Sequence, residues 1–379
     1  EGWELLGDDA FVRRTIERLH ALGIRAILYV RAYVSENSLA TDPPGLVGEV
    51  ARRGLAAKTR DGDPYFFTAN ESPALLYDFT NPATVRFWQQ RRLKRMLDLG
   101  ADGFMQDFGE HTFDAMRFAD GSTGEQMHNR FPVLYHRLSR AYVDRYAREH
   151  RGGQPVWFFT RAGYSGRPGS AASEMGNFPG DETTNWEGAS GLRSLAPDML
   201  NRAVGGSFGY TTDIGGYADL LSGATTPELF TRWSEWSALT PYFRVHNSVT
   251  FGTRMPWDFG EETYDRWRAM ADLHQRALPL IRRLWAEGRR TGVPPTRPLW
   301  LAAPGDRRAA AEDQEWLLGD DVLVAPVVEE GAAGREVTFP RGCWASPQGG
   351  ERVRGPAVRR IEAPPGRLPY FMRCGARPF

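Results

Sequence analysis

Two aspartates stand where an alternating strand-and-loop fold would present reactive side chains. Asp107 ends the apolar run 103–108, and Asp181 closes the segment 177–181, which reads Asn-Phe-Pro-Gly-Asp. A charged carboxylate is costly in a hydrophobic core but stable at a barrel mouth. Cleavage of a glycosidic bond needs two such groups, one ionised and one carrying a proton. Trp186, shortly after Asp181, offers a face for sugar stacking and a means of desolvating the acid. On spacing alone this pattern is weak, since a strand-end aspartate more often caps a helix.

The elements that must position these acids alternate between helix and strand. Apolar periodicity predicts helices at 9–22, 82–99, 124–149, 198–203 and 226–238, and strands at 24–30, 103–108, 156–161, 174–179, 208–214 and 242–246. Strands separated by helices pair in parallel through crossover connections. Several of these strands end in a polar residue followed by a glycine-rich loop, as in a (β/α)8 TIM-type barrel.

The pattern changes after a long predicted helix at 262–286. From about residue 298 the sequence consists of short apolar runs with Pro and Gly between them, which is typical of a small all-β domain. We therefore place a domain boundary near residue 290. Residues 1–290 are assigned to the α/β barrel and 291–379 to a small C-terminal β-sandwich.

Composition excludes several classes of partner. The chain of 379 residues has 47 basic and 47 acidic side chains, so it has no electrostatic footprint for nucleic acid or an anionic membrane. Its two cysteines, Cys343 and Cys374, favour two free thiols in a cytoplasmic protein, with a single bridge left open. The first residue, Glu1, suggests neither a translation start nor a signal peptide, and we interpret the chain as a piece of a longer protein.

The motifs around the two acids resemble those of glycoside hydrolase family 31. They occur in family order along essentially the whole chain, at 78–82, 103–110, 159–163, 178–181 with Trp186, 212–217, 243–246, 297–299 and 318–327. The resemblance implies a retaining α-glycosidase without metal or nucleotide cofactor. It implies a small-molecule or oligosaccharide α-glycoside as substrate and leaves a homo-oligomer open.

The same resemblance assigns roles to individual residues. Asp107 would attack the anomeric carbon as nucleophile, and Asp181 would act as general acid and then as general base. Arg161 and His246 would bind sugar hydroxyls, and Asp213 would shape the pocket. Structural roles stay open: Arg161 also suits an ion pair, and His246 a buried core histidine. We interpret Glu110 as a brace of the barrel mouth.

Two departures from the usual family pattern resemble the sulfoquinovosidase branch. Many family α-glucosidases have Asp-Met-Asn-Glu at the nucleophile and Phe after Ile-Gly-Gly, where this chain has Asp-Phe-Gly-Glu at 107–110 and Tyr217. The segment Met-His-Asn at 127–129 fits the same branch. A tyrosine hydroxyl can donate a hydrogen bond to a sulfonate at sugar C6, whereas Phe cannot. The alternative is that Tyr217 is only a larger aromatic wall.

Other hypotheses stay open at this point. Family barrels have a β-sandwich and two further strands before the one at 24–30, and Trp3 would belong to the loop after the second of these. A transglycosylase and a non-catalytic carbohydrate-binding relative are the alternatives to a hydrolase. Retention requires the carboxyl groups of Asp107 and Asp181 to lie about 5–5.5 Å apart.

Overall fold

The computed structural model describes residues 8–36, 42–69, 72–166, 173–217, 219, 223–246, 254–350 and 352–379. Trp3 lies outside these ranges. The chain divides into two compact units, Glu1–Gly176 and Asn177–Phe379, and each is described by itself. The boundary predicted near residue 290 separates the barrel from the C-terminal β-domain. It does not coincide with the division at residue 176, and it stays a prediction.

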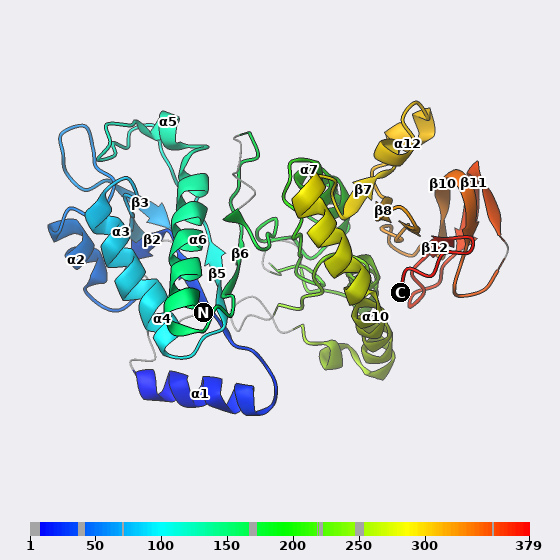
Figure 1. Cartoon of the computed structure of the whole chain (residues 1–379), viewed down its shortest axis with the longest axis horizontal. Helices are drawn as coiled ribbons and strands as arrows, with labels where there is room; N and C mark the ends of the chain where they lie inside the picture. The colour runs from blue at the N-terminus through cyan, green and yellow to red at the C-terminus, as the bar shows by residue number, and fades with distance from the viewer. Residues whose placement is uncertain are drawn as a thin grey trace. The chain divides into compact units, whose positions relative to one another are not determined.

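Unit 1 is built around a small parallel sheet (Figure 1). Its strands follow the order β1-β5-β6, and residue 31 of β1 lies opposite residue 107 of β5. A second sheet, antiparallel, has the order β2-β4-β3. The strands are β1 (Ile27–Arg31), β2 (Tyr33–Ser35), β3 (Phe66–Ala69), β4 (Ser72–Leu76), β5 (Gly103–Asp107) and β6 (Trp157–Thr160). The helices are α1 (Asp9–Ala21), α2 (Leu46–Arg52), α3 (Pro82–Trp88), the π-helical η1 (Gln89–Lys94), α4 (Arg95–Asp98), α5 (Gly124–Met127) and α6 (Phe131–His150).

Local sequence signals explain where these helices begin. Asp8 caps α1 by accepting from the backbone N–H groups of Ala10 and Phe11, and Asn81 caps α3 by accepting from that of Ala83. Thr123 and Gln126 form a reciprocal capping box at the start of α5. The helix predicted at 82–99 is present as α3, η1 and α4 in succession. The helix predicted at 124–149 is divided into α5 and α6.

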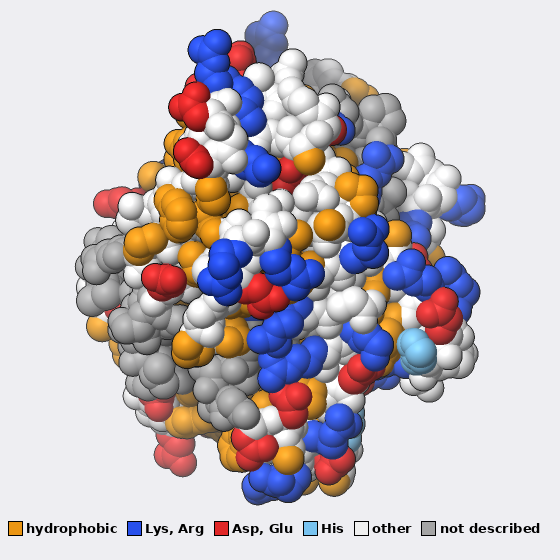
Figure 2. All heavy atoms as spheres, turned by 90° about the vertical axis from the view of Figure 1, so that its left-hand side faces the viewer, with side chains coloured by type: hydrophobic (Ala, Val, Ile, Leu, Met, Phe, Trp, Pro, Cys, Tyr) orange, Lys and Arg blue, Asp and Glu red, His pale blue; other side chains and the backbone are white. Residues whose placement is uncertain are grey.

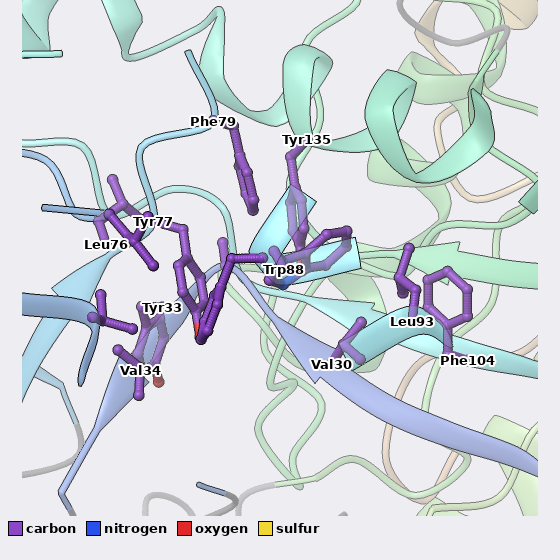
Figure 3. Close-up of a cluster of buried hydrophobic side chains, with 14 of the residues drawn as sticks. Val30, Tyr33, Val34, Leu76, Tyr77, Phe79, Trp88, Leu93, Phe104 and Tyr135 are labelled. Carbon is purple, nitrogen blue, oxygen red and sulfur yellow. The ribbon is translucent and has the colours of Figure 1, made fainter. Parts of the chain in front are cut away.

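An aromatic core supports the end of the parallel sheet in unit 1 (Figure 3). Trp88 is fully buried, with its ring 5.2 Å from that of Phe79 and 5.4 Å from that of Tyr135. Val30 of β1 and Phe104 of β5 belong to the same buried cluster. The close packing of large rings holds the carboxyl ends of β1 and β5 in a fixed position.

Unit 2 contains helices followed by an antiparallel sheet. Its helices are η3 (Leu192–Ser194), α7 (Leu195–Val204), α9 (Pro227–Ser237), η4 (Pro256–Phe259), α10 (Glu261–Thr291), α11 (Leu299–Ala302) and α12 (Arg307–Ala311). Its strands are β7 (Thr296–Pro298), β8 (Trp316–Leu318), β9 (Val322–Val324), β10 (Gly334–Ala345), β11 (Val353–Glu362) and β12 (Tyr370–Arg373). The six strands form one sheet in the order β11-β10-β12-β9-β8-β7. The strands predicted for the C-terminal domain therefore form an antiparallel sheet, with the short helices α11 and α12 between β7 and β8. Leu317 and Leu323 belong to one hydrophobic cluster, and Trp316 and Val324 belong to another.

Three segments that we expected to be strands are irregular. At 174–179, 208–214 and 242–246 the described residues contain no regular strand. Single contacts join them in the expected order: Asn177 bridges to Tyr210 in parallel, and Ile214 donates its backbone N–H to the carbonyl of Arg244. Gly176 and Pro179 interrupt the first of these segments and Gly209 the second, which shortens the ladder that they can form; the segment 242–246 contains neither residue type.

The prediction of two free thiols is wrong. Cys343 and Cys374 form a disulfide with their Cα atoms 5.3 Å apart. The two residues meet because β10 and β12 pair antiparallel, with Trp344 opposite Arg373. Such bridges persist mainly in oxidising compartments, and the cytoplasmic location stays a prediction. Among the described helices, none is both long and apolar enough to cross a membrane.

Surface charges agree with the balanced composition. On the face shown in Figure 2, Lys and Arg side chains lie next to Asp and Glu side chains over much of the surface. The described helices also contain pairs of opposite charge four residues apart, such as Lys94 with Asp98 and Arg140 with Asp144. Pairs of this kind contribute about 0.3–0.5 kcal/mol each, so they favour solubility more than stability.

Candidate active site

One group of candidate residues lies in unit 1, where Asp107 ends β5. Its side chain is buried, with only 6% of the residue exposed. The hydroxyl of Tyr29 donates to Oδ2 of Asp107 over 2.7 Å, and the backbone N–H of Phe108 donates to Oδ1 over 2.9 Å. Nε of Arg161 lies 3.4 Å from Oδ1. Each oxygen therefore accepts a hydrogen bond, and Oδ1 also lies near a cation. These contacts stabilise the ionised carboxylate and compensate for the free-energy cost of its burial.

The backbone that follows Asp107 is strained. Phe108 has φ 58°, and in the part of the chain that the structure describes it is the one non-glycine residue with positive φ. Gly109 follows at φ 120°, where a Cβ atom would lie 3.3 Å from Cβ of Ala162. A bulky residue in the left-handed region costs of order 1–3 kcal/mol and persists only where its surroundings hold it. Here the ring of Phe108 lies 3.8 Å below the guanidinium of Arg161 and 4.9 Å from the ring of Tyr33.

Arg161 lies between two carboxylates. Its Nη2 contacts Oε1 of Glu110 while its Nε faces Asp107. Glu110 is about half exposed, with 45% of its side chain accessible. Arg161 therefore forms ion pairs with both carboxylates. The contact of Glu110 with Arg161 is the kind expected of a residue that braces this region. Burial lowers the pKa of the neighbouring His111, so its ring is neutral at pH 7.

A buried ion-pair cluster beside the nucleophile candidate was missed from the sequence. Arg31, opposite Asp107 in the register of β1 and β5, donates to Asp42 over 2.6 Å and to Ser35 over 2.9 Å. Arg92 contacts the other oxygen of Asp42. Tyr29 and Arg31 share one face of β1 because they are two residues apart. That alternation of polar residues at the end of an apolar strand was the signal that could have found them.

A separate group of candidate residues lies in unit 2. Asp181 is exposed and follows Gly180, which has φ 116°. The next residue, Glu182, is 2% exposed and accepts from the hydroxyl of Thr212 and from the backbone N–H of Asp213. Burial, reinforced by the charge of Asp213, raises the pKa of Glu182 well above its usual range. Two adjacent carboxyl groups thus have opposite environments, with Asp181 open to solvent and Glu182 inside as a structural acid.

The loop carrying Asp213 and Tyr217 packs directly on the loop carrying Asp181. The backbone N–H of Tyr217 donates to the carbonyl of Glu182 over 2.8 Å. A Cβ atom on Gly216 would lie 2.9 Å from Cα of Thr184, so only glycine allows this approach. The guanidinium of Arg254, fully buried, donates to the carbonyls of Gly216 and Tyr217 over 2.7 and 2.6 Å. Sequence reasoning did not identify Arg254.

Asp213 contacts an arginine and a histidine on the neighbouring segment. It is 1% exposed, and its carboxylate contacts Nη2 of Arg244 and lies 3.4 Å from Nδ1 of His246. Burial alone would raise the pKa of Asp213, but Arg244 and His246 outweigh it and hold the pKa below its ordinary value. The His246 ring lies 4.8 Å from that of Tyr217. Unit 2 therefore brings together Asp213, His246 and Tyr217, three of the residues predicted to bind sugar.

Trp186 has a different setting from the one expected. It is half-buried and packs against the hydrophobic cluster of unit 2 that contains Trp233 and Leu229. The ring of Trp186 therefore packs against the hydrophobic core of unit 2. A sugar-stacking role for its accessible face stays a prediction.

Comparison with known proteins identifies the family. A sequence model of the Glycosyl hydrolases family 31 TIM-barrel domain matches residues 8–284, and one of the Glycosyl hydrolase family 31 C-terminal domain matches residues 292–376. The chain belongs to glycosyl hydrolase family 31. This confirms the family resemblance and the fold class, a TIM-type barrel domain followed by a C-terminal domain with an antiparallel sheet.

Several relatives in family 31 are similar over nearly the whole chain. A sulfoquinovosidase of Escherichia coli K12 is 31% identical over 95% of this chain and 51% of its own length, and one of Agrobacterium fabrum is 30% identical over 98% and 55%. A solved structure of a family 31 sulfoquinovosidase from E. rectale, in complex with an aza-sugar inhibitor, is also similar. It superposes with TM-score 0.86 at 28% sequence identity, and the match covers 96% of this chain and 53% of that protein. The chain thus spans about half the length of the relatives it matches.

Proposed function

We propose that this chain carries the catalytic residues of a retaining, exo-acting α-glycosidase that acts on terminal α-sulfoquinovosides. Asp107 is the nucleophile and Asp181 the general acid/base. The proposal rests above all on the setting of Asp107, a buried carboxylate at a strand end whose ionised form is stabilised by Tyr29, the Phe108 amide and Arg161.

The reaction has two displacements. An oxygen of Asp107 attacks the anomeric carbon while the bond to the leaving oxygen breaks and Asp181 delivers its proton to that oxygen. Water then attacks the glycosyl ester, Asp181 takes a proton from that water, and the bond to Asp107 breaks. Solvent exposure of Asp181 suits a group that must lose and regain a proton in each turnover.

Recognition of the sugar is assigned to groups around each acid. Arg161 holds Asp107 and, with His246, supplies donors for sugar hydroxyls. Asp213 orients His246, and its contacts with Arg244 and His246 hold the loop that carries it in place. Tyr217 supplies a hydroxyl donor for an anionic substituent at C6, and the two relatives named sulfoquinovosidases support that substrate class.

The test is turnover of 4-nitrophenyl α-sulfoquinovoside and α-glucoside by the full-length protein. We expect the sulfoquinovoside to have the larger kcat/KM and Asp107→Asn to abolish turnover of both. Wild-type turnover by Asp107→Asn would refute the nucleophile assignment. Binding without turnover across α-glycosides would indicate a non-catalytic carbohydrate-binding protein, and sugar transfer in place of hydrolysis products would indicate a transglycosylase.

A further inference from the structure

A cavity of about 430 Å³ lies in unit 2, lined by residues of the turn between β10 and β11, of β11 and of β12. Its lining includes one acidic side chain, Glu362, and five arginines. The arginines are Arg352, Arg354, Arg359, Arg360 and Arg367. In a chain with equal numbers of basic and acidic residues, this is a strong local excess of positive charge.

These five arginines differ from others in the same sheet. Arg335 of β10 is paired with Glu312 and Glu315, and Arg297 of β7 with Glu287 and Asp320. Within the described ranges no carboxylate lies within ion-pair distance of any of the five cavity arginines. All five are exposed. Mutual repulsion among unpaired cations opposes folding, so an arrangement of this kind is explained better by a ligand than by stability.

The rest of the lining has the composition of a small-molecule site. Phe371, with 4% of its surface exposed, Pro369 and half-buried Ile361 provide apolar wall. Gln348 and Ser346 add an amide and a hydroxyl at the edge. Cavities that bind small ligands combine an apolar lining with a few polar groups in this range of volume.

We propose that this cavity binds a small organic or inorganic anion carrying at least two oxyanion groups. A guanidinium presents two parallel N–H donors, which match the oxygens of a phosphate or carboxylate. Several arginines among the residues that line one cavity favour a multiply charged ligand over a single carboxylate. The site uses none of the residues assigned to glycoside cleavage, so it goes beyond the proposed function as a second, non-catalytic binding site.

Calorimetric titration of the full-length protein with pyrophosphate and with citrate tests the proposal, with acetate and glucose for comparison. We expect saturable binding of pyrophosphate or citrate that is at least tenfold tighter than binding of acetate, and that weakens as salt rises. The double variant Arg359→Gln/Arg360→Gln should weaken it at least tenfold. Arg341→Gln is the matched control, since Arg341 is an exposed arginine of β10 outside the cavity.

The proposal is overturned if pyrophosphate and citrate bind no more tightly than acetate, or if Arg341→Gln weakens binding as much as the double variant. Binding of duplex DNA alone, without pyrophosphate or citrate, would also overturn it. Should the double variant unfold at a lower temperature than wild type, Arg354→Gln decides instead, and unchanged binding by it refutes the site. Turnover of α-glycosides should be the same in all these variants.

Discussion

The hydroxyl of Tyr29 donates a 2.7 Å hydrogen bond to Oδ2 of Asp107, from the strand next to the one that Asp107 ends. The bond positions the carboxylate and leaves its other oxygen to Arg161 and the Phe108 amide. A tyrosine in this place acts through the proposed nucleophile and not through the substrate. It should therefore affect the rate of the chemical step more than substrate binding.

For Tyr29→Phe we expect kcat to fall about 10- to 100-fold, since a hydrogen bond to a charged group is worth about 1.5–3 kcal/mol. KM should change little. Steady-state kinetics on one α-glycoside measures both. Tyr146→Phe is the matched control, because the Tyr146 hydroxyl also donates to an aspartate, Asp98, over 2.9 Å in the same unit. Equal losses in the two variants would show that the effect is one of general stability.

The roles of Asp107 and Asp181 are separated by azide rescue with an activated α-glycoside. Asp107→Gly should lose about 10⁴-fold or more in kcat, and azide, attacking from the vacated side, should yield a β-glycosyl azide. Asp181→Ala should lose about 10²- to 10⁴-fold, and azide attacking the glycosyl-enzyme should yield an α-glycosyl azide. Proton NMR of the anomeric hydrogen reads the configuration. The reverse pairing of product and variant would exchange the two roles.

The parts of the site that follow from one strand and its loop were predictable from the sequence. Asp107 sits at the end of an apolar run, and that run is β5. The contacts of Tyr29 and Arg31 depend on the register between β1 and β5, which no local pattern states. Likewise, the Cys343–Cys374 bridge depends on the pairing of β10 with β12, two strands that are far apart in the sequence.

Irregular segments limited the prediction in a different way. Glu182 looked like a neighbour of the catalytic candidate, yet it is the residue that is buried, because its loop turns at Gly180 and leaves Asp181 outside. Adjacent acids cannot be told apart by type. Only the path of the backbone, held by the bond from Tyr217 N–H to the carbonyl of Glu182, assigns one to the interior and one to solvent.

Tyr217→Phe should change substrate preference and leave the loop intact. The backbone of Tyr217 donates its N–H to Glu182 and accepts from Arg254 at its carbonyl, and these two contacts survive loss of the hydroxyl. We expect kcat/KM for an α-sulfoquinovoside to fall about tenfold or more, with α-glucoside turnover within about threefold of wild type. Parallel kinetics on both substrates measures the ratio. An unchanged ratio would assign Tyr217 to the pocket wall alone.

Stability of the C-terminal sheet should depend on pH through Glu315. Burial raises the pKa of this carboxyl from 4.5 to about 8, although Arg335 and the backbone N–H of Thr338 favour its charged form. Between these two values the folded state holds a proton that the unfolded state has released. The free energy of unfolding must then fall as the pH rises from about 4.5 to 8, by an amount on the order of a few kcal/mol.

Glu315→Gln should flatten this dependence, because the amide cannot titrate, and Arg335 keeps Glu312 as a partner. Urea denaturation at pH 5 and pH 9, followed through the fluorescence of buried Trp316 and Trp344, measures the difference. Wild type should lose more stability between the two pH values than Glu315→Gln does. Glu336→Gln, an exposed glutamate of the same sheet, should behave like wild type. If wild type and Glu315→Gln lose stability in parallel, Glu315 is ionised throughout and its pairing with Arg335 outweighs its burial.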